Sequence, residues 1–391
     1  MGESEIMGNL YQRFPVRVER GEGALVWDDK GRSYVDCMAG YGVALLGHAN
    51  RGVADAVAAQ MSRITTVHAS LYSATREIFL ERLTGLAPAG ISRAFLCSSG
   101  SEAVEAAIKM ARKATGRGRI VSMRGAYHGK THGALSLTFN PKYKKAFGPM
   151  MEGVEFAPFG DAGALRDMVG DQTAMVIIEP VQGESGINVA PDGFLEEARG
   201  ICDGAGALLA FDEIQAGLGR TGRMWACDHW GVAPDIMCLA KGLAGGVPMG
   251  AALTTEAVMS AMSKGEHSST FGGNPLACAA GTETLSQIEG GLVGNAAAVG
   301  AGLMEGLREI SARHPVVREV RGLGLMIGVE LKFDVRGVLD DLIDDGVLML
   351  YSGRNILRLL PPLVITHGQA SKVLHSLDLA LGAEEERRGI R

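Results

Sequence analysis

The feature that most constrains the fold is a series of short apolar runs that do not alternate with polar residues. Five such runs lie at 94–97, 120–123, 174–178, 207–211 and 236–239. Runs of this kind are typical of strands that are buried on both faces, as in a parallel sheet covered by helices. A helical pattern follows the first run, with one apolar face formed by Val104, Ala107, Ile108 and Ala111. We therefore predict an α/β domain with a mostly parallel sheet over residues 50–285.

A charged residue follows three of these runs closely. Glu179 and Asp212 come directly after two of them, and Lys241 comes two residues after the last. In parallel sheets, ligands bind beyond the carboxyl ends of the strands, so we expect these three side chains to share a site. Each also has a simpler explanation. Lys241 could be a surface lysine in a glycine-rich turn, and Asp212 could be a helix cap or the ion-pair partner of Arg220 or Arg223.

The two ends of the chain differ from its middle. Residues 1–49 contain a hairpin pattern, and residues 286–391 contain strand-like runs at 325–330 and 356–359 followed by a helix. We expect the two ends to build one smaller α+β domain together. The charged residues 384–391 are expected to form a frayed tail.

Composition excludes several classes of protein. The net charge of −6 does not favour nucleic acid, which selects a basic face. No run reaches the roughly 20 apolar residues of a membrane span. The first residues lack the apolar region of a signal peptide, so we expect a cytoplasmic protein. The six cysteines form no Cys-x-x-Cys pair and have no histidine at ligand spacing, which predicts buried core thiols and no metal site.

Lys241 and Asp212 suit the chemistry of a cofactor. Small residues surround Lys241, and desolvation there lowers the pKa of an amine and makes it a nucleophile that can form a Schiff base. Asp212 ends an apolar run, so its carboxylate needs a partner. The protonated ring nitrogen of pyridoxal 5′-phosphate (PLP) is a suitable one.

Two other segments offer sites for an anion. Ser99, Gly100 and Ser101 join a strand to a helix N-terminus, where free N–H groups favour phosphate, although the same residues also make an ordinary cap. Ser269 and Thr270 bring hydroxyls to a polar turn. These two groups of residues are candidate phosphate ligands.

Two more candidates come from single side chains. Tyr127, in a Tyr-His-Gly segment, could stack on a cofactor ring. Arg358 lies within an apolar run and needs an anion, which could be Glu184 or the carboxylate of a substrate. A salt-bridged core arginine is the simpler alternative for Arg358.

Together these segments resemble the class III (ω-amino acid) aminotransferases of PLP fold type I, whose large domain has a seven-stranded sheet. The resemblance runs from about residue 21 to 363. The segments that carry it, in order, are 31–36, 46–48, 98–103, 128–129, 179–184, 212–222, 239–242 and 269–275. Within the class, the segments 179–184, 270–275 and 359–363 resemble the acetylornithine and ornithine branch. The segments 34–37, 41–44 and 140–143 resemble aminotransferases of carrier-protein-linked lysine and ornithine biosynthesis.

The resemblance implies a role for each residue of a PLP site. Lys241 would form the Schiff base and move the proton, and Asp212 would hold the pyridinium nitrogen. Ile214 and Tyr127 would cover the two ring faces, and Gln215 would bond the ring hydroxyl. The remaining implied cofactor residues are Ser99, Gly100, Ser101, His128, Glu179, Ser269 and a Thr270 supplied by the partner subunit of a homodimer.

The resemblance also implies a substrate site. Arg358 would bind the α-carboxylate of glutamate or 2-oxoglutarate, and Glu184 would cover Arg358 when a blocked substrate binds. Acetylornithine enzymes usually carry Arg where this chain has Lys130, which keeps the charge but loses the bidentate fork. Tyr41 and Ser269 would complete the site.

The implied reaction moves the terminal amine of an N-blocked diamino acid to 2-oxoglutarate, giving a semialdehyde and glutamate in arginine or lysine biosynthesis. N-acetylornithine is one such donor, and ornithine or lysine linked to an amino-group carrier protein is another. The alternatives are an ornithine or γ-aminobutyrate aminotransferase and a glutamate-1-semialdehyde-type aminomutase. A non-enzymatic PLP-binding domain of a regulator is a third, although no helix-turn-helix module flanks the motifs.

Overall fold

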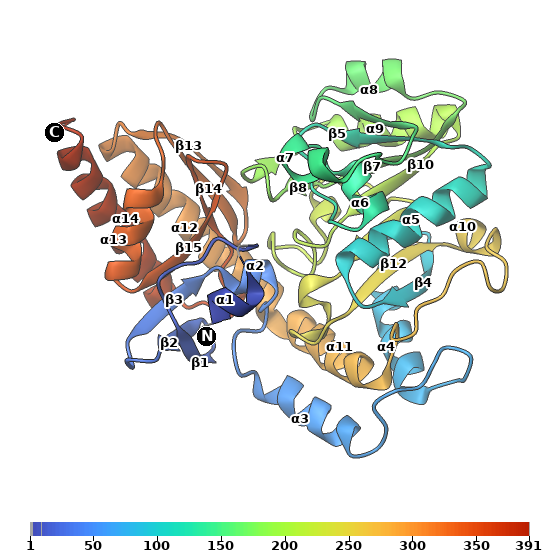
Figure 1. Cartoon of the computed structure of the whole chain (residues 1–391), viewed down its shortest axis with the longest axis horizontal. Helices are drawn as coiled ribbons and strands as arrows, with labels where there is room; N and C mark the ends of the chain where they lie inside the picture. The colour runs from blue at the N-terminus through green and yellow to red at the C-terminus, as the bar shows by residue number, and fades with distance from the viewer. Residues whose placement is uncertain (1–2, 9, 391) are drawn as a thin grey trace.

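A computed structural model describes residues 3–8 and 10–390 of the chain. Figure 1 shows two lobes. The strands from the blue N-terminal end and the red C-terminal end lie together in one lobe, and the middle of the chain forms the other. Each lobe is built on its own seven-stranded sheet.

The sheet of the middle segment is mostly parallel, which confirms the fold class. Its order is β4 (Ile91–Cys97), β12 (Gly250–Thr255), β11 (Ile236–Leu239), β10 (Leu208–Asp212), β7 (Thr173–Ile178), β5 (Arg119–Met123) and β6 (Val154–Ala157). Strand β12 is antiparallel to both neighbours, whereas the strands from β11 to β6 run parallel. All residues of β7, β10 and β11 except Leu208 are buried, as the unbroken apolar runs predict.

Helix α5 (Gly100–Thr115) packs against this sheet through its apolar face. Ser99 caps the helix at its start, and Gly116, with φ 69°, ends it in the left-handed conformation that glycine adopts without strain. The predicted apolar stripe of α5 is buried. The helix therefore presents its N-terminus at the edge where β4 ends.

The second sheet joins strands from the two ends of the chain. Its order is β1 (Val18–Glu22), β2 (Leu25–Asp28), β3 (Ser33–Cys37), β15 (Val347–Ser352), β16 (Ile356–Leu359), β14 (Met326–Leu331) and β13 (Val317–Leu323). Strands β3 and β15 pair in parallel and join the two ends. The domain boundaries after residues 49 and 285 stay a prediction.

Helices α12 (Val293–Arg313), α13 (Arg336–Asp344) and α14 (His367–Arg387) pack beside the second sheet. The prediction that residues from 384 onward fray is wrong as far as Arg387, because α14 continues through them. Glu384 is buried and accepts hydrogen bonds from the side chains of Arg387 and Arg388. These charged side chains therefore pair with one another instead of being solvated separately. Arg391 lies outside the described residues.

The other elements connect and cover the two sheets. The helices are α1 (Glu3–Met7), α2 (Ala39–Gly42), α3 (Arg51–Met61), α4 (Ala74–Gly85), α6 (His132–Leu137), α7 (Pro141–Lys144), α8 (Ala162–Met168), α9 (Phe194–Ala205), α10 (Glu256–Ser260) and α11 (Pro275–Gln287). The short segments are η1 (Lys145–Phe147), β8 (Val181–Gln182), β9 (Asn188–Val189), η2 (Ala226–His229), η3 (Lys241–Ala244) and η4 (Ile288–Leu292). Among the described residues, no helix is both long and apolar enough to cross a lipid bilayer.

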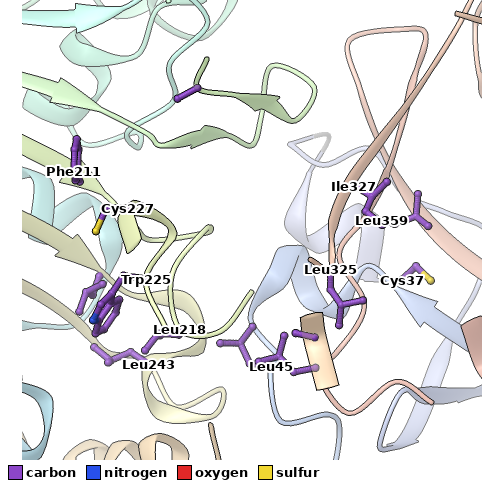
Figure 2. Packing of buried hydrophobic residues seen from close by; sticks show 14 of the residues in the cluster. Cys37, Leu45, Phe211, Leu218, Trp225, Cys227, Leu243, Leu325, Ile327 and Leu359 are labelled. Carbon is purple, nitrogen blue, oxygen red and sulfur yellow. The ribbon is translucent and has the colours of Figure 1, made fainter. Parts of the chain in front are cut away.

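One hydrophobic core runs through both lobes. Figure 2 shows Phe211 and Trp225 on one side, Ile327 and Leu359 on the other, and Leu45 between them. The six cysteines are all buried, which confirms that they are core residues. This shared core holds β10 of the first sheet and β16 of the second in a defined relation.

Candidate active site

Lys241 begins the turn η3 immediately beyond β11, and its backbone is strained. Its φ of 45° lies in the left-handed region, which residues other than glycine seldom adopt and which often marks a functional site. The pKa of its amine is lowered from 10.5 to about 8, chiefly by burial and also by the charge of Arg358, while the charge of Asp212 opposes the shift. A much larger fraction of this amine than of an ordinary lysine is therefore neutral and nucleophilic near neutral pH.

Asp212 forms a buried pair with His128. Its Oδ2 lies 2.7 Å from Nδ1 of His128, and its Oδ1 accepts a hydrogen bond of 3.1 Å from the backbone N–H of Ile214. Burial alone would lower the pKa of His128, but the hydrogen bond and charge of Asp212 raise it overall. His128 and the backbone of Ile214 thus fix the orientation of the Asp212 carboxylate. The alternative ion pairs are wrong, because Arg220 and Arg223 bond backbone carbonyls instead.

Glu179 holds two loops at the same edge of the sheet. Its carboxylate accepts hydrogen bonds from the backbone N–H groups of Tyr127, at 3.0 Å, and Gly183, at 3.2 Å. Burial raises its pKa to about 7, and these bonds and His128 oppose that rise. The half-buried Tyr127 thereby receives a fixed position beside the Asp212–His128 pair.

The start of α5 forms a narrow cradle with bare backbone. A Cβ on Gly100 would lie 2.8 Å from Cδ1 of Ile214, so glycine is needed there. Ser99 accepts from the backbone N–H of Glu102 at 3.3 Å, and Ser101 accepts from that of Lys130 at 3.3 Å. Ser99 thus makes the ordinary cap, and the binding of a phosphate at this helix N-terminus stays a prediction.

Ser269 and Thr270 lie close to the same helix end. With Ser98 and Glu102 they line a cavity of about 330 Å³. Thr270 is exposed, and the Ser269 hydroxyl accepts a hydrogen bond of 3.0 Å from the backbone N–H of Gly272. The supply of Thr270 to the site of a partner subunit stays a prediction.

Arg358 lies on β16 with no exposed surface and faces the loop after β8. Its Nη1 donates to the carbonyl of Gly183 at 2.8 Å and to Oε2 of Glu184 at 3.2 Å. Its Nε and Nη2 are buried, and no described residue accepts a hydrogen bond from them. Unpaired buried donors cost free energy, so this edge of the guanidinium suits a carboxylate.

Tyr143 is a site residue that sequence reasoning missed. Its hydroxyl donates to Oε1 of Glu184 at 3.1 Å, and its ring meets that of Tyr127 edge-on at 5.8 Å. The exposed Lys130 lies with its amine 5.2 Å from the centre of the Tyr143 ring. The sequence contains no periodicity or spacing that connects Tyr143 with Glu184, 41 residues away.

The side chain of Gln215 contacts the backbone of Tyr41. Gln215 Nε2 donates to the carbonyl of Tyr41 at 3.3 Å, while its Oε1 is buried without a partner among the described residues. The Tyr41 side chain is 48% exposed, so it is free to contact a bound molecule.

The residues present fit PLP. The cofactor has a phosphate, a ring nitrogen, a ring hydroxyl and an aldehyde. The site offers the bare N-terminus of α5 near Gly100, the buried Asp212 carboxylate, the unpartnered Oε1 of Gln215 and the Lys241 amine. Within residues 3–8 and 10–390, no group of three or more His, Cys, Asp or Glu side chains is placed to hold a metal ion.

The lowered pKa of Lys241 leads to a pH prediction. Only the neutral amine attacks an aldehyde. We therefore expect the rate at which cofactor-free protein takes up PLP to rise with pH, through a midpoint near the lowered pKa of about 8, and then to level off. In Asp212→Asn the midpoint should fall, because the Asp212 charge raises the pKa of Lys241. Stopped-flow absorbance between about pH 6 and about pH 11, which brackets the lowered and the ordinary lysine pKa, measures both. A midpoint above about 10 would contradict the burial of this amine.

Comparison with known proteins agrees with this site. The model of the family described as aminotransferase class-III matches residues 6–381. A LysW-aminoadipate semialdehyde transaminase of Deinococcus radiodurans is 45% identical over 99% of this chain and 91% of its own length. An acetylornithine aminotransferase of Methanopyrus kandleri is 44% identical over 96% of each chain.

A solved structure places the cofactor in the same fold. The ornithine aminotransferase of Toxoplasma gondii, described with PLP at partial occupancy in its active site, superposes with a TM-score of 0.94 at 34% identity. The superposition covers 97% of this chain and 92% of the other. PLP fold type I is thereby confirmed. The chain belongs to the class-III aminotransferases, which use pyridoxal 5′-phosphate.

Proposed function

We propose that the chain moves the terminal amine of an N-blocked diamino acid to 2-oxoglutarate, releasing a semialdehyde and glutamate. N-acetylornithine or a carrier-linked ornithine or lysine would be the donor, which places the enzyme in arginine or lysine biosynthesis. The observation that carries the proposal is the Arg358–Glu184 contact of 3.2 Å at the end of a buried guanidinium. A pocket that can cover or uncover one cation can accept two different substrates in turn.

The names of the relatives support this donor class. The Deinococcus protein is named for a LysW-linked semialdehyde and the Methanopyrus protein for acetylornithine. Neither name is that of an aminomutase. Lys130 stands where acetylornithine enzymes usually carry Arg, and its exposed amine reaches the mouth of the site beside Tyr143. We assign it to the anionic group of the blocked donor.

Each side chain has a distinct task in this reaction. PLP, when bound, supplies the electron sink for breaking the bond to hydrogen at the amine-bearing carbon. The Lys241 amine would take that proton and return it to the C4′ carbon of the cofactor, since its lowered pKa suits both steps near neutral pH. Asp212, held by His128, would pair with the ring nitrogen of the cofactor. Arg358 binds the α-carboxylate of glutamate or 2-oxoglutarate once Glu184 has moved away.

Two assembly features belong to the same proposal. A homodimer would bring Thr270 of one subunit to the phosphate of the other, and the exposure of Thr270 and Phe271 leaves them available for that contact. A carrier-linked donor would add a protein partner.

The test is to offer the enzyme acetylornithine, ornithine, γ-aminobutyrate and a carrier-linked amine, each with 2-oxoglutarate, and to follow glutamate. We expect the blocked donors to react with the higher kcat/KM. A faster reaction with free ornithine or γ-aminobutyrate would move the enzyme to another branch of the family. If no donor yields glutamate above background, the proposal fails, and turnover of glutamate-1-semialdehyde without 2-oxoglutarate would support the aminomutase.

A further inference from the structure

Two groups hold the Glu184 carboxylate, one at each oxygen. Arg358 Nη1 donates to Oε2 at 3.2 Å, and the Tyr143 hydroxyl donates to Oε1 at 3.1 Å. Burial and the charge of Glu184 raise the pKa of the Tyr143 hydroxyl, so it keeps its proton and remains a donor. The position of Glu184 over Arg358 is therefore held jointly by an arginine of one lobe and a tyrosine of the other.

The surroundings leave only the side chain of Glu184 free to move. Its backbone carbonyl accepts a hydrogen bond from the Ser352 hydroxyl, and the neighbouring carbonyl of Gly183 accepts from Arg358. Glu184 itself is about one-third exposed, at 35% of its side chain. Rotation of one carboxylate is thus enough to uncover the guanidinium.

Tyr143 is itself fixed in place. It lies on α7, whose first turn is capped by the Asn140 side chain through the backbone N–H of Lys142 at 3.0 Å. The next residue, Lys144, has its amine 4.3 Å from the centre of the Phe156 ring, and the Tyr143 ring rests against Tyr127. A donor held this firmly favours one orientation of its acceptor.

We propose that Tyr143 is a positioning residue that sets how readily Glu184 leaves Arg358, and thereby sets the selectivity between dicarboxylate and blocked-amine substrates. The inference rests on the proposed function and deepens it. The negative charge of Glu184 at Nη1 opposes a second carboxylate on the free edge of the same guanidinium, so a dicarboxylate displaces Glu184. Its apparent affinity then carries the full cost of breaking the Tyr143 bond. A blocked amine binds with Glu184 in place, so it does not carry that cost.

The test compares Tyr143→Phe with the wild-type holoenzyme in separate half-reactions, followed by the cofactor absorbance. Loss of the hydroxyl should lower the KM for glutamate and 2-oxoglutarate by about three- to tenfold, because a hydrogen bond to a partly exposed charged group is lost. The KM for the blocked amine should stay within about twofold, since the closed orientation still dominates. In both half-reactions kcat should change by less than about threefold.

Matched variants separate this role from a structural one. Tyr34→Phe removes a hydroxyl that also donates to a carboxylate, Asp28 at 2.9 Å, but within the hairpin of β2 and β3, and should leave every KM unchanged. In a Glu184→Ala background, Tyr143→Phe should have no further effect on the KM for 2-oxoglutarate. Tyr143→His keeps a ring and a donor and should restore part of the wild-type selectivity, and it serves as the second variant if Tyr143→Phe does not fold.

The outcomes distinguish this inference from the proposed function. If the wild type carries out both half-reactions but Tyr143→Phe leaves the KM for 2-oxoglutarate unchanged or raises it, the inference is overturned. It is also overturned if the effect persists in full without Glu184. If the wild type shows no half-reaction with glutamate, the proposed function itself has failed, whatever the variants do.

Discussion

Replacing Lys241 with alanine should lower the rate of amine transfer by about 10⁴-fold or more, because the group that takes and returns the proton is removed together with the covalent attachment of the cofactor. The measurement is single-turnover kinetics with glutamate as donor. Dialysis should also remove PLP from the variant far faster than from the wild type.

Lys30→Ala is the control for this variant, since Lys30 is exposed in the turn between β2 and β3 and should tolerate the change. Circular dichroism must show that Lys241→Ala keeps its fold. A folded variant that retains activity within about tenfold of the wild type would remove Lys241 from the chemistry.

Replacing Arg358 with methionine should lower kcat/KM for 2-oxoglutarate by about 30- to 3,000-fold, the range for losing one member of a buried, hydrogen-bonded charge pair. Methionine has a similar length and leaves no buried cation. The half-reaction with a blocked amine should fall by no more than about fivefold, because that substrate binds while Glu184 covers the site. Separate half-reaction kinetics provide the measurement.

Arg354→Met is the matched control for Arg358→Met. Arg354 lies four residues earlier in the turn between β15 and β16, but its side chain is exposed and pairs only weakly with Asp334 at 3.4 Å. It should leave both half-reactions unchanged. Equal losses in the two half-reactions of Arg358→Met would show that Arg358 stabilises the fold and does not select the substrate.

The strands around the site could be predicted because a strand buried on both faces appears in the sequence as an unbroken apolar run. Each of the five apolar runs lies at a strand, and Glu179, Asp212 and Lys241 follow neighbouring parallel strands. The parallel topology then places those side chains at one edge.

The frayed C-terminal tail was the wrong expectation, because a run of charges has the same appearance whether it is solvated or paired. Only the partners on α14 distinguish the two cases.

Burial patterns and residues close to strand ends were enough to predict the α/β sheet, the family likeness and the placement of Lys241 and Asp212 at the ends of neighbouring strands. The tertiary structure alone decided the partners of those residues. His128 reaches Asp212 across 84 residues, and Arg358 reaches Glu184 across 174 residues. His128 lies after β5 and Asp212 ends β10 of the same sheet, whereas Arg358 and Glu184 come from different lobes. Both contacts depend on how distant parts of the chain pack, and no local sequence pattern determines them. Tyr143 belongs to this second group, since its ring and hydroxyl gain a function only where α7 lies over the loop that carries Glu184.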